Sequence, residues 1–174
     1  QLGKFETTSS NRSLELLSSA SAFTGTIADI RFNGPDSASA TAEHIYSAVV
    51  GGIEVNTNGS EDGFLDLKTS VNGTLTSALY IDGDSNVGIG VTPTHNFNLQ
   101  GTGTVESRFR STDGDCSLQI SSDTDEGQNS ELAFYSGTTN RGSIVYDHNT
   151  TAASQKMLFK TGDNAVTAMT IDGA

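Results

Sequence analysis

Apolar and polar residues alternate at a period of two in several short stretches, the pattern of strands that bury one face. The clearest are Asp29–Phe32, His44–Val50, Phe64–Lys68 and Thr74–Ile81. The last two flank Asn72-Gly73, a favoured dipeptide for a two-residue hairpin turn. The pattern therefore predicts an all-β protein with a hairpin at this point.

Clusters of glycine, asparagine and proline predict where the other strands end. Asn33-Gly34-Pro35 predicts a turn, Gly51-Gly52 a break in a strand, and Asn56–Gly63 an acidic loop. Between these, Asp36–Glu43 is open to two interpretations, a short helix or a loop that leads into the next strand. The loop is favoured because serine and threonine compete for the backbone hydrogen bonds of a helix.

The stretch Tyr80–Pro93 combines a strand, a tight turn and a second short strand. Asp82-Gly83-Asp84 supplies the turn, because glycine accepts positive φ and aspartate bonds its own backbone. The following strand has a bare opposite face, formed by Gly88 and Gly90, which allows another backbone to approach closely. An apolar row along this stretch is the candidate core of an assembly: Leu79, Ile81, Val87, Ile89 and Val91.

The second half of the chain repeats the first in the same order. The offset falls from 104 residues, between Phe5 and Phe109, to 90 residues, between Ser77 and Thr167, as expected if loops are shorter in the second copy. The matched segments are 5–8 with 109–112, 13–16 with 117–120, 30–32 with 132–134, 65–69 with 157–161, and 77–83 with 167–173. The match makes Met169 and Ile171 the counterparts of Leu79 and Ile81, and adds them to the candidate core.

Two tandem copies predict an elongated array in which each unit packs on its neighbours. The first repeat is expected at 1–96 and ends with the strand Val87-Gly88-Ile89-Gly90. The second is expected at 97–174 and stops before the counterpart of that strand. We therefore expect a fragment or a cleaved product.

The composition favours association over a self-sufficient core. Leu, Ile, Val and Phe supply 38 of 174 residues, and the net charge is −12. Such values border on disorder, but the apolar residues form short, regularly spaced clusters. Partner chains would supply the buried area that one chain lacks.

The charge also excludes some partners. Nine scattered basic residues argue against nucleic acid and anionic membranes, and no apolar run is long enough to span a bilayer. The single cysteine, Cys116, excludes an intrachain disulfide.

The segment Asn86–Pro93 resembles the GNVGIGTTSP signature in the stems of bacteriophage tail fibres and tailspikes, which often precede an intramolecular chaperone domain of the endosialidase type. Segments 59–69, 141–147 and 168–174 are similar to other blocks of these stems. The resemblance implies a homotrimer whose three chains run parallel along a fibre, with intertwined or prism-like β-structure. It implies a virion component outside the cell, joined to other tail proteins and acting in host attachment.

The sequence offers little catalytic chemistry. Most acids lie beside Gly, Ser or Asn in turns, and His44, His95 and His148 have neither metal-ligand spacing nor a nucleophile motif. Asp123–Gly127 suggests calcium, but a solvated acidic turn is favoured because the spacing of an EF-hand is missing. We therefore expect no enzyme activity, no metal and no cofactor, and the binding residues stay undefined.

Two alternatives to a structural stem remain open. One is a tip module whose loops, Asn56–Gly63 and Asp123–Ser130, bind a bacterial surface glycan. The other, with less support, is a tailspike that cleaves such a glycan with paired carboxylates.

Overall fold

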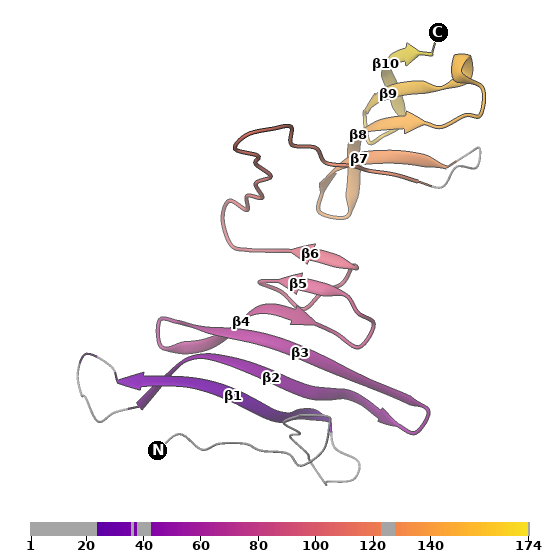
Figure 1. The fold of residues 1–174 in the computed structure, drawn as a ribbon. Coiled ribbons are helices and arrows are strands. Elements are labelled where there is room, and N and C mark those ends of the chain that lie inside the picture. Colours follow the sequence, from indigo (N-terminus) through magenta and orange to yellow (C-terminus); the bar gives the residue numbers. More distant parts are fainter. Residues whose placement is uncertain (1–23, 36, 38–42, 123–127, 174) are drawn as a thin grey trace. The chain divides into compact units, whose positions relative to one another are not determined.

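The computed structural model describes residues 24–35, 37, 43–122 and 128–173. The chain divides into two compact units, Gln1–Glu106 and Ser107–Ala174 (Figure 1). Over the described ranges, strands make up the regular structure of both units, apart from one 3-10 turn, η1 (Ala152–Ser154). The prediction of an all-β protein is confirmed.

The first unit contains a six-stranded sheet whose strands follow one another in chain order. They are β1 (Gly25–Pro35), β2 (Glu43–Thr57), β3 (Ser60–Val71), β4 (Thr74–Ile81), β5 (Val87–Ile89) and β6 (Phe97–Leu99). Neighbours from β1 to β5 are antiparallel, and β6 is parallel to β5. Because β6 belongs to this sheet, the sheet extends beyond residue 96, where the sequence placed the end of the first repeat.

Two-residue turns join the long strands of this sheet. Asn72 and Gly73 have φ of 50° and 79° and connect β3 to β4, which confirms the predicted hairpin. A second turn, with Gly59 at φ 81°, connects β2 to β3. The predicted loop over Asn56–Gly63 is therefore wrong, because the strands extend to Thr57 and begin again at Ser60.

Two other predicted interruptions lie inside strands. β2 continues through Gly51-Gly52, where a Cβ on Gly52 would overlap the Phe64 ring and the Gly25 carbonyl oxygen. Glycine here serves close packing and does not end the strand. β1 likewise continues through Asn33 and Gly34 to its last residue, Pro35. It is the outermost of the described strands of this sheet, a position where proline is tolerated.

The short connection between β5 and β6 is unusual for parallel neighbours, which normally need a crossover of about a dozen residues or more. Residues 90–96 suffice here because the chain folds back tightly, with Gly90 at φ 74° and Pro93 buried. A Cβ on Gly88 would overlap the Val91 carbonyl oxygen. The absence of a side chain at Gly88 therefore allows the backbone of the following turn of the same chain to approach β5 closely.

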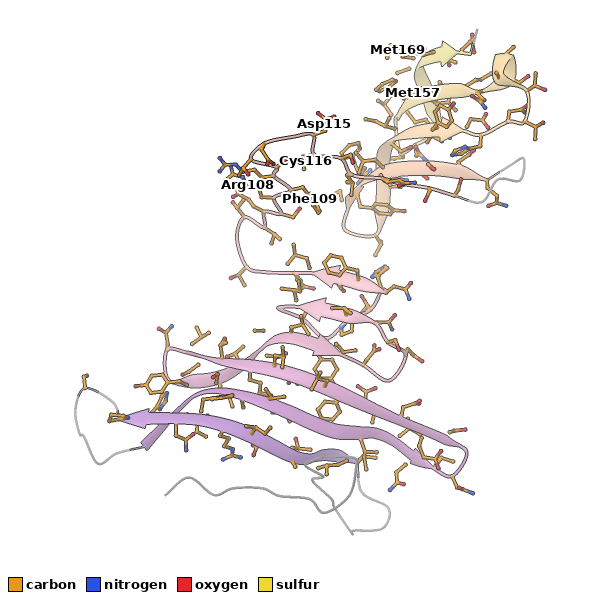
Figure 2. All side chains as sticks on the ribbon, viewed as in Figure 1. Arg108, Phe109, Asp115, Cys116, Met157 and Met169 are labelled. Atoms are coloured by element: carbon orange, nitrogen blue, oxygen red, sulfur yellow. The ribbon has the colours of Figure 1, made fainter. Side chains whose placement is uncertain are left out.

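The second unit contains a four-stranded antiparallel sheet, also in chain order. Its strands are β7 (Asn129–Ser136), β8 (Thr139–Asp147), β9 (Lys156–Thr161) and β10 (Val166–Asp172). An irregular segment precedes β7 and carries the labelled residues Arg108, Phe109, Asp115 and Cys116 (Figure 2). Segment 117–120, which the sequence matches to 13–16, forms no strand.

The meander β1–β4 and the meander β7–β10 share their register. In the first, the aligned pairs are Ile30–Val49, Leu67–Val49, Leu67–Leu79 and Leu65–Ile81. In the second, they are Leu132–Ile144, Phe159–Ile144, Phe159–Met169 and Met157–Ile171.

The irregularities of the two meanders also correspond. The register shifts at Ala78 in β4 and at Ala168 in β10, immediately before Leu79 and Met169. It shifts again after Phe32 in β1 and after Phe134 in β7. Because a bulge re-aims the strand around it, matching bulges give the two meanders the same order of inward and outward side chains.

Candidate association surface

One face of the first sheet is apolar across all six strands. Residues directly opposite on neighbouring strands point to the same side, so the register fixes which side chains share a face. Leu79 lies opposite Ile89, and Ile81 lies opposite Val87, while β6 adds Phe97 and Leu99 beside β5. The face also includes Ile30, Phe32, Val49, Leu65 and Leu67.

Much of this face is open to solvent in one chain. Its exposed large side chains are Ile30, Phe32, Leu65, Leu67, Ile89, Phe97 and Leu99. The substantial contacts of each strand are with strands of its own sheet, so no second layer of described strands covers the face. An exposed apolar patch of this kind usually marks an interaction site.

The second unit has an equivalent apolar face. Leu132, Ile144, Phe159 and Met169 form one row across its four strands, and Tyr146, Met157 and Ile171 contribute a second. Met169 is 48% exposed and Ile171 is 52% exposed. Met157 and Met169 lie on neighbouring strands in Figure 2.

Each unit has an open hollow lined partly by its apolar face. In the first unit, a hollow of about 380 Å³ is lined by residues that include Ile27, Ile30, Val49 and Leu65. In the second, one of about 250 Å³ is lined by Leu132, Ile144 and Met157, with Leu118 and Ile120 from the irregular segment. The polar groups at either hollow are too few to define a small-molecule site.

The opposite face of each sheet holds the most buried residues. On the first sheet these are Ala48, Val50 and Asp66, and on the second they are Ser143 and Val145. The buried Asp66 carboxylate lies 3.1 Å from Lys68 Nζ, so its negative charge has an ion-pair partner in place of solvent.

Tyr80, Phe64 and Glu54 form a polar cluster on this same face of the first sheet. The rings of Tyr80 and Phe64 stack with centroids 5.4 Å apart, and the Tyr80 hydroxyl donates to Glu54 Oε1 over 2.8 Å. Burial and the adjacent Glu54 carboxylate raise the pKa of Tyr80 well above its usual range. The cluster therefore keeps a neutral phenol as a hydrogen-bond donor.

The structure places the predicted core residues in two groups. Leu79, Ile81, Val87 and Ile89 share the apolar face of the first sheet through direct cross-strand pairs. Met169 and Ile171 lie on the corresponding face of the second sheet. Val91 lies beyond the end of β5, so its predicted place in the same strand is wrong. The period-two pattern did not identify Phe97 and Leu99, because two apolar residues separated by one polar residue are too few to define a strand.

Residues with catalytic potential lie apart from these faces or in structural contacts. His44 Nε2 lies 3.1 Å from Ser70 Oγ, and His148 Nε2 lies 2.9 Å from Ser130 Oγ. Cys116 is exposed. Over the described ranges, no group of three or more His, Cys, Asp and Glu side chains is arranged to hold a metal ion. The acidic segment Asp123–Gly127 lies outside the described residues.

No helix in the described part of the chain is long and apolar enough to cross a bilayer. No family model and no curated protein matches the sequence.

Proposed function

We propose that this chain is a structural stem segment of a phage tail fibre or receptor-binding protein that acts in host attachment. Three identical chains associate through the apolar faces of their sheets, and the virion is their location. The observation that carries the proposal is that both sheets consist of a single described layer with one apolar face exposed.

The energetics of these faces support association. Burial of a large apolar side chain contributes roughly 1.5–3 kcal/mol. The first sheet exposes seven such side chains on its apolar face, which are Ile30, Phe32, Leu65, Leu67, Ile89, Phe97 and Leu99. Because these side chains are 36–65% exposed in one chain, burying what remains exposed contributes about 5–9 kcal/mol per chain. This gain is of the same order as the cost of association, about 4–15 kcal/mol.

The shared register and bulges of the two meanders support a repeated stem unit. A repeat array extends a fibre by adding equivalent sheets, and each sheet brings its own apolar face to the assembly. The resemblance of Asn86–Pro93 to tail-fibre stems supports the same assignment. Three copies carry a formal charge of −36, three times −12, which keeps fibres soluble.

Sedimentation equilibrium of the full chain tests the proposal. We expect a species of about 54 kDa, three times the chain mass of 18.1 kDa, at micromolar concentration. A folded monomer at that concentration would contradict the trimer.

A matched pair of variants on β10 locates the interface. Ile171 lies on the apolar face and its neighbour Thr170 on the other, and both side chains are exposed. Ile171→Asp should shift the equilibrium toward monomer, because three carboxylates would enter an apolar interface. Thr170→Asp should leave it unchanged. Equal effects of the two variants would remove the apolar face from the interface.

Binding to host glycans separates a stem from a tip module. We expect the chain to show no saturable binding on an array of bacterial surface glycans. Tight, saturable binding would make the chain a receptor-contacting module, and release of reducing ends would make it a depolymerase.

A further inference from the structure

We infer that the outer edge of β10 is an acceptor site for an added antiparallel strand whose sequence follows the pattern of Asn86–Gly90. The inference rests on strand register within one chain and stands apart from the proposed trimer. The occupant is a segment in which asparagine precedes two apolar residues separated by one glycine.

β4 and β10 occupy equivalent positions in their sheets. Ile81 and Leu79 pair with β3 as Ile171 and Met169 pair with β9, and both outer strands shift register at an alanine. β4 then receives β5 on its other side, through Leu79–Ile89 and Ile81–Val87. β10 is the last strand of its sheet, so its outer side has no partner strand among the described residues.

The backbone groups of β10 point alternately toward β9 and toward the outer edge. Gly173 N donates to Gln155 O, so the N–H of Gly173 faces the β9 side. Successive backbone groups of a strand point to opposite sides, so Thr170 and Asp172 direct theirs to the outer edge. In β4 the counterpart of Asp172 uses this edge, since Asp82 N donates to Asn86 O over 3.1 Å. The counterpart of Thr170, Tyr80, lies opposite Gly88 of β5, and farther along the same edge Gly90 N donates to Ala78 O over 3.2 Å.

A side-chain contact with asparagine would select the occupant. The Asp82 carboxylate accepts hydrogen bonds from the backbone N–H of Asn86 at 2.8 Å and from its side-chain amide at 3.0 Å. Asp172 is the counterpart of Asp82 and its side chain is exposed. An arriving asparagine can make the same two bonds with Asp172.

The apolar row on β10, formed by Met169 and Ile171, is more exposed than its counterpart on β4. Leu79 and Ile81 are half-buried, with β5 beside them, whereas Met169 and Ile171 are 48% and 52% exposed. An added strand with apolar residues at two alternate positions would cover Met169 and Ile171 as Ile89 and Val87 cover Leu79 and Ile81.

The test is a chain extended by a second copy of residues 84–101, joined directly after Gly173 so that the connection matches that between Gly83 and Asp84. Hydrogen exchange of single amides is followed by NMR. We expect exchange of the Thr170 and Asp172 amides to slow at least tenfold relative to the original chain. The amides of Met169 and Ile171, which face β9, should change little and serve as internal controls.

A matched extension carries Asp at the copied positions of Val87 and Ile89 and should give no protection. Asp172→Ala in the first extension should reduce the protection, because the asparagine loses its partner. Unchanged exchange at Thr170 and Asp172 would overturn the inference. It would also be overturned if the original chain already protects these two amides in a concentration-dependent way, since a second copy would then occupy the edge. Sedimentation of the same samples reports on the trimer independently.

Discussion

The hydrogen bond from the Tyr80 hydroxyl to Glu54 Oε1, 2.8 Å long, links β4 to β2 across the intervening strand β3. The other carboxylate oxygen, Oε2, accepts from Gly83 N at 2.9 Å. One exposed glutamate therefore connects the second strand to both the fourth strand and the turn that follows it. The contact holds that turn, and with it β5, in register with the sheet.

The first prediction concerns the pH dependence of this contact. The pKa of Tyr80 is raised, so the folded state holds the phenol proton more tightly than the unfolded state. The stabilisation is complete below the ordinary tyrosine pKa of about 10 and falls as the pH rises above it. Between pH 8 and pH 11 the free energy of unfolding, measured with urea, should fall less for Tyr80→Phe than for the original chain.

At neutral pH the same variant should lower the free energy of unfolding by about 1 kcal/mol, the value of one hydrogen bond. Tyr135→Phe is the control, since Tyr135 is exposed at the end of β7. An identical pH profile for Tyr80→Phe and the original chain would show that the hydroxyl has no such role.

The second prediction concerns Gly88, which is buried opposite Tyr80. A Cβ there would overlap the Val91 carbonyl oxygen, which cannot move without opening the turn after β5. Gly88→Ala should lower the free energy of unfolding by about 1–3 kcal/mol, measured by denaturant unfolding.

Gly51→Ala is the matched control, because a Cβ on Gly51 meets no atom within 4 Å. It should be neutral or stabilise by up to about 1 kcal/mol, since alanine restricts the unfolded chain. If both variants lost the same stability, the close approach of backbone at Gly88 would not be the cause.

The third prediction concerns Ser85, which holds φ at 65° in the turn between β4 and β5. This region costs an ordinary residue about 1–2 kcal/mol, and glycine avoids that cost. Ser85→Gly should therefore raise the midpoint of thermal unfolding, by a net free energy of up to about 1 kcal/mol after the greater entropy of unfolded glycine is subtracted. A lower midpoint would mean that the serine side chain contributes more than its backbone strain costs.

The fourth prediction concerns Ile89, which is 37% exposed on the apolar face of the first sheet. Ile89→Asp should block assembly, because each carboxylate near the interface would meet two copies of itself without solvent. The control Thr92→Asp adds the same charge at an exposed position beyond β5. Size-exclusion chromatography with light scattering should give a monomer for the first variant and a trimer for the second; a heat-stable trimer of Ile89→Asp would place Ile89 outside the interface.

Local patterns predicted the fold class because they act over a few residues. Asn72-Gly73 gave the right hairpin, since both residues accept positive φ. The alternation around Leu79 and Ile81 correctly predicted that the two side chains lie on one face of a strand. The matched segments also paired Ile30 with Leu132 and Leu79 with Met169, which occupy the same register in the two meanders.

Glycine and proline were the least predictable residues, because their meaning depends on distant partners. The pair Gly51-Gly52 is typical of a strand break, but β2 continues through it. Glycine is needed at Gly52 because a Cβ there would overlap the Phe64 ring and the Gly25 carbonyl oxygen. The turn expected at Asn33-Gly34-Pro35 is instead the last part of β1, and the Tyr46 hydroxyl of β2 donates to the Pro35 carbonyl over 2.9 Å. The parallel step to β6 was also missed, since nothing local to Phe97-Asn98-Leu99 specifies β5 as its neighbour.

The strict chain order of the first sheet has a mechanical consequence. Each strand bonds to the strand before it, and strands lie about 4.8 Å apart, so the chain advances sideways from β1 to β6. A pull applied between Gly25 and Leu99 would act across the strands and load their hydrogen bonds one ladder at a time, beginning with the three-residue pair of β5 and β6. A single copy under tension should peel from this end at low force.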